Sequence, residues 1–449
     1  METAKAIGAM GTAGTEAARV LAADLGGYVG ESVRVAGWLH AVRALGGVTF
    51  ALVRDRTGIT QVVFAATPPA LVGLGVESVI AVTGRVVAEE RAAGGAELHA
   101  DGENAVAVLA AVTEQPPFEI NKRTLNAHLD TFLDHAAVGL RHPAKAATFR
   151  IVGAMAGALR AAFEARGCTE IHTPKIVAGA TEGGANLFPV RYFARDAALA
   201  QSPQLYKQMM VGALERVYEI APVFRAEPHA TTRHLNEYVS VDVEIGFITD
   251  HHTVMRFLRE SLADAFARVA AERAADLALL GATVPTVGDI PAIHFRDALE
   301  LITTKYGDNV RGETDLAPQH ERWLGAWARE EYGADFLFVE GYPTTKRPFY
   351  TMPDPARPGY TNGFDLLYRG LEVTTGGQRI HGEAQLRASM ARFGIAPEGF
   401  AGYLEAFHYG MPPHGGFAIG LERLVGQLLG LANVREAALF PRDLHRLTP

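Results

Sequence analysis

The sequence predicts an α+β protein in which a small β-barrel precedes a larger domain built on an antiparallel sheet. Residues 32–113 read as short strands broken by glycine, which is typical of a barrel or sandwich. From residue 142 onward, long strands are mixed with helices without a regular strand–helix alternation. The chain has 449 residues, which suits two or three domains rather than one.

The expected barrel occupies residues 30–114, after an N-terminal extension of residues 1–29 and before a linker of residues 115–141. Strands are expected at residues 33–38, 48–53, 59–64, 78–87 and 105–112, with glycine-containing turns between several of them. Five short strands suit an OB barrel, whose open face commonly binds single-stranded nucleic acid.

The second domain is expected to span residues 142–449. A helix is predicted at residues 149–165, where apolar residues recur at helical spacing, and strands are predicted at 169–174, 216–224, 238–248, 363–374 and 416–419. Residues 270–342 are expected to form a helix-rich insert. This irregular mixture favours an antiparallel α+β sheet over a doubly wound one.

Composition narrows the class of protein. The 42 Lys and Arg residues against 50 Asp and Glu give a net charge of −8, which argues against a general nucleic-acid coat but allows a local basic face. The sequence has no uninterrupted apolar run of roughly 18 residues and no secretory signal, so a cytoplasmic protein without a membrane span is expected.

Cysteine and histidine usage bears on metal sites. The single cysteine, Cys168, excludes an intrachain disulfide framework and a zinc site made of several cysteines. His251 and His252 are adjacent, and adjacent side chains are expected to face apart on a helix or strand, so a shared zinc ion is not expected there.

The segment 224–237 carries the strongest chemical signal. Arg225 and Glu227 lie two residues apart on an expected strand, so their side chains should point the same way. Arginine suits a phosphate or carboxylate, and glutamate accepts hydrogen bonds from an amino group. The pair predicts a nucleotide clamp made without a glycine-rich loop; a surface hairpin with exposed ion pairs is the alternative.

Four segments together carry a family resemblance. They read Ile-His-Thr-Pro-Lys at 171–175, Gln-Ser-Pro-Gln-Leu-Tyr-Lys-Gln at 201–208, the hairpin at 224–244, and Gly-Leu-Glu-Arg-Leu at 420–424 with Phe-Pro-Arg-Asp at 440–443. From about residue 33 to its end, the chain resembles a class II aminoacyl-tRNA synthetase, specifically the aspartyl subgroup of the short archaeal type. The resemblance implies ATP-dependent activation of L-aspartate to aspartyl-adenylate and its transfer to the 3′ end of tRNA(Asp), with tRNA(Asn) left open as a second substrate. It also implies a homodimer, with Pro174 near the subunit contact.

The resemblance assigns the ATP site. Arg225 would contact the α-phosphate and Arg423 the γ-phosphate as the catalytic arginines. The alternative for Arg423 is a pairing with Glu422 or a nearby carboxylate on a solvated face. Glu372 and Thr375 would hold the Mg²⁺ that accompanies ATP; an ion pair of Glu372 with Arg369 or Arg379 is the alternative. The residues implied to bind ATP are Arg225, Ala226, Glu227, Arg233, His234, Leu235, Glu372, Gly420, Leu421, Glu422 and Arg423.

The resemblance also assigns the amino-acid pocket. Lys207 and Arg379 would read the side-chain carboxylate of aspartate; the asparaginyl relatives lack a lysine at this position, so Lys207 favours aspartate. An asparagine–tRNA ligase and a catalytically inactive RNA-binding paralogue remain the alternatives. Glu182 lies beside paired glycines, which suit a loop that closes over substrate. The residues implied to bind aspartate are Glu182, Gln204, Leu205, Tyr206, Lys207, Arg225, Asp242, Thr375 and Arg379.

In the barrel, Phe50 and Gln61 lie on adjacent expected strands. By resemblance they stack on and hydrogen-bond the central anticodon base, whereas a place in the barrel core is the alternative for Phe50. Glu97 is expected to assist. His40 is expected at the edge of the base-binding face, where a histidine resembles relatives that charge both tRNAs. Residues 88–91 lack the proline that such relatives tend to carry, so the breadth of tRNA use stays open.

Overall fold

The computed structural model describes residues 19–102, 104–179 and 186–449. The chain divides into two compact units, Met1–His142 and Pro143–Pro449, each with its own core. Glu182, expected in a substrate-closing loop, lies outside the described residues.

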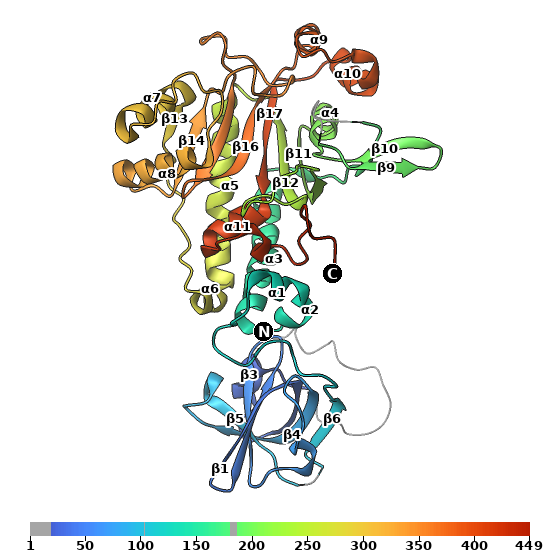
Figure 1. Cartoon of the computed structure of the whole chain (residues 1–449), viewed down its shortest axis with the longest axis vertical. Helices are drawn as coiled ribbons and strands as arrows, with labels where there is room; N and C mark the ends of the chain where they lie inside the picture. The colour runs from blue at the N-terminus through green and yellow to red at the C-terminus, as the bar shows by residue number, and fades with distance from the viewer. Residues whose placement is uncertain (1–18, 103, 180–185) are drawn as a thin grey trace. The chain divides into compact units, whose positions relative to one another are not determined.

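The first unit is built on a barrel of short strands (Figure 1). Its strands are β1 (Ser32–Leu45), β2 (Val48–Arg54), β3 (Ile59–Phe64), β4 (Val79–Ala88), β5 (Ala96–His99) and β6 (Val106–Ala110). The order β1-β2-β3-β5-β4 closes on itself because β4 also pairs with β1, so the predicted five-stranded OB barrel is confirmed. The fifth strand of the ring is β5, not the expected 105–112, which forms β6 and pairs with β4 outside the ring.

Side chains that alternate in direction along the strands fill the barrel core. Along β2 and β3, every second residue is buried, and Ala51, Val53, Val62 and Phe64 meet in the core. Glycine is required at Gly37, because a Cβ atom there would lie 2.1 Å from the Arg54 carbonyl oxygen. Short helices complete the unit: η1 (Ala22–Tyr28), η2 (Pro69–Leu71), η3 (Ala93–Gly95), α1 (Leu129–Asp134) and α2 (Ala136–Gly139).

The second unit is built on an eight-stranded sheet. Across the sheet the order is β13 (Ala292–His294), β14 (Phe336–Glu340), β15 (Gly363–Tyr368), β16 (Leu371–Arg379), β17 (His414–Gly420), β12 (Glu237–Gly246), β11 (Arg216–Phe224) and β7 (Thr169–Glu170). The inner pairs are antiparallel and only the two outermost pairs are parallel. The predicted α+β class is therefore confirmed. A separate small sheet contains β8 (Ile176–Val177), β9 (Pro189–Tyr192) and β10 (Arg195–Leu199).

Helices cover both faces of the large sheet. On one face, α3 (Pro143–Glu164) and α5 (His251–Glu272) lie side by side over a core that includes Phe163, Phe364 and Phe417 (Figure 1). On the other face, α7 (Phe295–Tyr306) and α8 (Pro318–Tyr332) pack on Leu337 and Val339 of β14. The remaining helices are α4 (Gln204–Leu214), α6 (Ala274–Leu280), α9 (Glu383–Arg392), η4 (Pro397–Phe400), α10 (Ala401–His408), α11 (Leu421–Leu429) and η5 (Val434–Ala437).

Three expected elements differ in the structure. The single strand expected at 363–374 is a hairpin, because Arg369 and Gly370 adopt positive φ angles of 47° and 75° and reverse the chain. The strand expected at 169–174 ends at Glu170. The segment 270–342 contains α6, α7 and α8, but it also supplies β13 and β14 to one edge of the main sheet.

Helix α3 is long and apolar enough, by length and composition alone, to cross a membrane. Its apolar side chains nevertheless have partners within the second unit: Ile151, Met155, Leu159 and Phe163 are fully buried in the core. This packing is that of a core helix.

Candidate active site

A cavity of about 250 Å³ opens on the large sheet, on the face opposite α3 and α5. The loop between β11 and β12, strands β16 and β17, and the start of α11 form its walls. Most residues implied to bind ATP line it: Arg225, Glu227, Arg233, His234, Leu235, Glu372, Gly420, Glu422 and Arg423. Of the other two, Ala226 donates its backbone N–H to the Asn186 carbonyl at 3.0 Å, and Leu421 is buried in the core.

Arg225 and Glu227 stand in a loop rather than on the expected strand, because β11 ends at Phe224. Asn236 braces this loop: its side-chain amide donates to the carbonyl oxygens of Arg225 at 2.7 Å and Glu227 at 3.1 Å. The Arg225 guanidinium lies over the Tyr238 ring and 3.9 Å from the Glu227 carboxylate. Both side chains therefore face the cavity from a fixed loop, which does not fit a plain surface hairpin.

Arg423 joins three segments of the cavity wall. Its Nε donates to the Arg233 carbonyl at 3.2 Å, and its Nη1 donates to the Glu372 carbonyl at 3.3 Å and lies 3.9 Å from Glu372 Oε1. Glu422 is not its partner: both Glu422 carboxyl oxygens accept from the Val239 N–H, at 3.0 and 3.2 Å. Burial raises the pKa of Glu422 to about 7.

Glu321 of α8 is a functional candidate that sequence reasoning missed. Arg233 Nη2 donates to both Glu321 oxygens, at 2.8 and 2.7 Å, and Glu321 Oε2 also accepts from the Glu372 backbone N–H at 2.9 Å. Burial raises the pKa of Glu321 although Arg233 opposes the rise. Nothing near residue 321 in the sequence indicates this role, because its partners lie 88 and 51 residues away along the chain.

Carboxylate and hydroxyl oxygens gather beside Arg423. The Thr375 hydroxyl lies 3.0 Å from Glu372 Oε1 and 2.9 Å from Asp365 Oδ1, and Arg347 lies 2.8 Å from Asp365. One hydroxyl proton can serve only one of these two carboxylates. Burial raises the pKa of Asp365, whereas Arg423 and Thr375 hold the pKa of Glu372 below its ordinary value against the effect of burial. This set of hard oxygen ligands fits Mg²⁺; Asp365 was not foreseen from the sequence.

Four of the residues implied to bind aspartate meet around Glu244. Lys207 is fully buried, with its Nζ 2.9 Å from Asp242 Oδ1 and 3.4 Å from Glu244 Oε2. Arg379 donates its Nε to Glu244 at 2.9 Å and its Nη2 to the Gln204 side-chain oxygen at 3.4 Å. Although burial opposes it, Arg379 and Lys207 hold the pKa of Glu244 below its ordinary value. Alternation along β12 places Asp242 and Glu244 on one face, and that pattern could have signalled Glu244.

This charged cluster adjoins the cavity floor. Thr375, Ala418 and Asp242 are neighbours across β16, β17 and β12, and Ser240 donates its hydroxyl to Asp242. Thr375, Ala418 and Ser240 line the cavity. Leu205 and Tyr206, also implied to bind aspartate, pack instead against apolar clusters on either side of α4.

Three of the expected barrel residues, Phe50, Gln61 and Glu97, lie outside the barrel core, and Glu97 is nevertheless buried. Phe50 pairs with Val63, and Leu52 pairs with Gln61, so Phe50 and Gln61 are diagonal neighbours on one face. Gln61 donates its side-chain amide to Glu97 at 2.7 Å. Phe50 is half-buried and lies outside the barrel core, so the core alternative is wrong.

His40 differs from its expected place at the edge of that face. It is buried, and its Nδ1 lies 3.2 Å from Arg54 Nη1, while Arg54 makes two hydrogen bonds of 2.7 and 2.8 Å to Glu77. A bulge between Leu39 and Ala41 lies at this position, and the two successive residues Leu39 and His40 are both buried. Burial lowers the pKa of His40.

The fold and the cavity define a class of enzyme. An antiparallel sheet presents arginines and carboxylates to one cavity, and the same chain carries a five-stranded barrel. Residues 128–444 match the family described as tRNA synthetases class II (D, K and N), and residues 33–104 match the OB-fold nucleic acid binding domain. The chain belongs to the class II tRNA synthetases, as the sequence motifs predict.

Relatives within this family are similar over their whole length. The chain is 48% identical to an aspartate–tRNA(Asp/Asn) ligase of Deinococcus radiodurans over 96% of this chain and 99% of that protein. It is 48% identical to the protein of the same name from Thermus thermophilus, over 96% and 100%. Among solved structures, it is similar to the asparaginyl-tRNA synthetase of Pyrococcus horikoshii in complex with asparaginyl-adenylate, with a TM-score of 0.88, 33% identity, and coverage of 96% and 99%.

Proposed function

We propose that this protein is a cytoplasmic aspartate–tRNA ligase. In the first step, an L-aspartate α-carboxylate oxygen attacks the α-phosphorus of ATP, which gives aspartyl-adenylate and releases diphosphate. In the second step, a terminal ribose hydroxyl of tRNA takes the aspartyl group and AMP leaves. The observation that carries this proposal is the pair of buried cations, Lys207 and Arg379, beside a cavity lined by Arg225 and Arg423.

The first step depends on positioning and charge neutralisation, because phosphoryl-type transfer needs no protein nucleophile. Arg225 would contact the α-phosphate and the reacting carboxylate, where negative charge gathers. Arg423 would contact the far end of the triphosphate. Glu372, Thr375 and Asp365 would hold Mg²⁺, which supplies positive charge to the phosphate oxygens when it is bound.

Selection of aspartate would depend on the buried cluster around Glu244. Lys207 and Arg379 bring two positive charges next to the cavity floor, and within the described residues Gln204 Nε2 has no hydrogen-bond partner. A donor that lacks a partner suits a substrate carboxylate. Asparagine would instead place an amide N–H₂ against these donors, and an unpaired buried charge costs about 3–5 kcal/mol.

The barrel would read the anticodon. Phe50 offers one face of a half-buried ring for stacking, and the hydrogen-bonded pair Gln61 and Glu97 offers an amide and a carboxylate to a base edge. We extend the proposal to tRNA(Asn) as well as tRNA(Asp), because the names of both relatives include both tRNAs.

Aspartate-dependent exchange of labelled diphosphate into ATP tests the first step. The wild-type protein should support exchange with aspartate and not with asparagine, and Arg225→Ala should lose at least about 100-fold, which is the effect of removing one strong contact to transition-state charge. Arg256→Ala, an exposed arginine on α5, is the matched control and should keep the wild-type rate. Wild-type rates in Arg225→Ala would refute the assignment.

Separate charging of tRNA(Asp) and tRNA(Asn) transcripts with labelled aspartate tests the second step. Comparable rates support use of both tRNAs, whereas a preference of several orders of magnitude for tRNA(Asp) restricts the function to that tRNA.

We also propose a homodimer. Beyond the edge strand β7, the chain exposes His172, Pro174 and Ile176, and Ile176 is 48% exposed. An apolar residue next to an open sheet edge favours a subunit contact. Sedimentation should show a dimer, and an active monomer at micromolar concentration would contradict it.

A further inference from the structure

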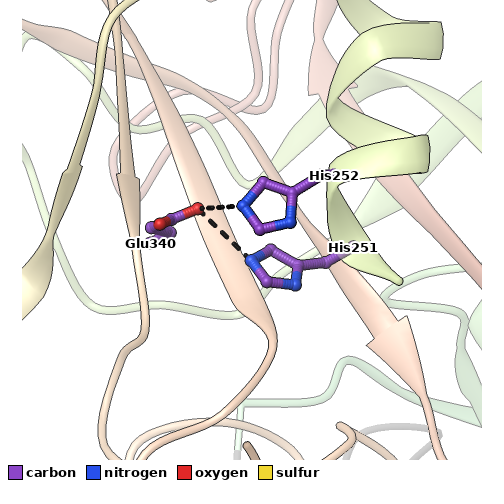
Figure 2. Close-up of side chains that lie close together, drawn as sticks. All are labelled: His251, His252 and Glu340. Atoms are coloured by element: carbon purple, nitrogen blue, oxygen red, sulfur yellow. Dashed lines mark hydrogen bonds and ion pairs between the residues drawn. The ribbon is translucent and has the colours of Figure 1, made fainter. Parts of the chain in front are cut away.

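Two histidines converge on one carboxylate at the start of α5 (Figure 2). His251 Nε2 lies 3.2 Å and His252 Nε2 lies 3.3 Å from the same oxygen, Glu340 Oε2, at the end of β14. The two imidazole rings have centroids 4.0 Å apart. The expectation that these neighbouring side chains face apart is therefore wrong. Adjacent helical residues differ by only about 100°, so both rings can reach the same oxygen.

This cluster lies on the opposite face of the sheet from the active-site cavity. Glu340 pairs with Phe364 of β15, and the Phe364 side chain lies in the core beneath α3 and α5. The next residue, Asp365, points to the other face, where it meets Thr375 at the cavity. The histidine cluster is thus separate from the carboxylates that fit the Mg²⁺ of ATP.

The spacing of the three ligand atoms matches a metal site. In a tetrahedral site with zinc–ligand bonds of about 2.0–2.2 Å, neighbouring ligand atoms are about 3.3–3.5 Å apart. The two nitrogen–oxygen distances here are 3.2 and 3.3 Å, and the three ligand atoms all lie within 4.8 Å of one another. Two of the three ligand-to-ligand distances are therefore already at about the length that a tetrahedral zinc site needs.

We propose that His251, His252 and Glu340 form a binding site for a divalent transition-metal ion of the zinc class. Imidazole nitrogen favours zinc, cobalt and nickel over Mg²⁺, which prefers oxygen ligands. Because imidazoles bind a metal in their neutral form, the three ligands together carry one negative charge. The Asp250 carboxylate brings a second negative charge, with its Oδ2 3.5 Å from His252 Nδ1. His252 is 56% exposed, so water can reach a fourth coordination position.

A bound ion would join two elements that are distant in sequence. Glu340 ends a strand near one edge of the sheet, and the histidines begin the long helix that covers the core. The site is therefore structural rather than catalytic, and occupation would raise the temperature at which the second unit unfolds.

The competing interpretation is a hydrogen-bonded cluster without metal, in which each Nε2–H donates to Glu340. Metal binding differs from it because the ion takes the place of both hydrogen bonds, and each ring then carries its proton on Nδ1. Stoichiometric uptake of Zn²⁺ therefore separates the two interpretations, because a hydrogen-bonded cluster binds no ion.

The test uses the full chain after treatment with a chelator, in excess Mg²⁺ to fill the catalytic carboxylates. Zn²⁺ is titrated calorimetrically, and Co²⁺ is titrated by visible absorption, which reports ligand geometry. Wild type should bind one Zn²⁺ ion per chain. His252→Ala should bind it at least about 100-fold more weakly, since even the loss of a residue that supports a metal ligand lowers metal affinity by about 10–100-fold. Glu340→Gln should show the same loss, and Zn²⁺ should raise the unfolding temperature of wild type but not of these two variants.

His408→Ala is the matched control. His408 Nδ1 lies 3.2 Å from Glu383 in an exposed histidine–carboxylate pair with a single histidine, so its loss should leave the binding unchanged. His252 is more than half exposed, so its replacement leaves the fold intact, as circular dichroism would check. Equal Zn²⁺ affinity and stoichiometry in wild type, His252→Ala and Glu340→Gln would overturn the proposal.

Discussion

Glu422 gives the sharpest test of the electrostatics of the active site. Its carboxyl group lies in the first turn of α11, 6% exposed, and both oxygens accept from the Val239 N–H. Burial raises its pKa from 4.5 to about 7, and nearby Glu237 adds to the rise. The ionised form is therefore disfavoured in the folded protein.

The direction and size of the effect follow from this pKa. Below pH 4.5 both the folded and unfolded chains hold the proton, so the stability that Glu422 contributes is fully present. As pH rises from 4.5 to 7 the unfolded chain releases the proton first, and stability falls. A rise in pKa from 4.5 to about 7 corresponds to about 3 kcal/mol in the free energy of unfolding. Glu422→Gln stays neutral and should lack this slope.

Urea denaturation of wild type and Glu422→Gln at pH 4.5, 6 and 8 measures the effect. The free energy of unfolding of wild type relative to the variant should fall by about 3 kcal/mol across this range. Glu331→Gln, an exposed carboxyl on α8, serves as the control and should follow wild type at every pH. If the difference between wild type and Glu422→Gln is constant with pH, the reasoning is refuted.

Three further predictions concern the buried charges. Lys207→Met should lower the free energy of unfolding by about 3–5 kcal/mol, because it leaves the buried Glu244 without one of its cations; a loss below about 1 kcal/mol in urea denaturation would contradict it. Glu321→Gln should raise the KM for ATP about 10-fold or more, because Arg233 loses a charge-assisted pair, and an unchanged KM in the exchange assay would argue against that role. Thr375→Val should raise the Mg²⁺ concentration needed for half-maximal exchange while Thr375→Ser keeps it, since only the hydroxyl joins the two carboxylates; equal requirements would exclude the hydroxyl as a ligand.

Local sequence pattern was sufficient to predict those elements whose structure depends on neighbours along the chain. Strand β3 was predicted with its observed limits, Ile59–Phe64, because alternation and flanking turns are local signals. Strand β5 was missed because it has only four residues directly after paired glycines. The bulge beside His40 was also missed, since the two strands that define it meet only in the folded barrel.

The candidate site shows the same division. Arg225 and Arg423 belong to sequence motifs and could be named in advance, and the structure places both at one cavity. Glu321 and Asp365 could not be named, because their importance comes from partners on other strands and helices. Tertiary contact alone brings a carboxylate of α8 to an arginine of the hairpin loop.

The position of Glu321 has a consequence for inherited or engineered variation far from the nucleotide. Leu324 and Ala328 of helix α8 pack into the apolar core next to β14. This packing sets how far the Glu321 carboxylate reaches toward Arg233. A substitution that loosens this packing would tilt the helix and weaken the contact of Glu321 with Arg233 in the proposed ATP site. We therefore expect some heat-sensitive variants of this enzyme to map to α8, with a defect in adenylate formation that precedes any loss of folded protein.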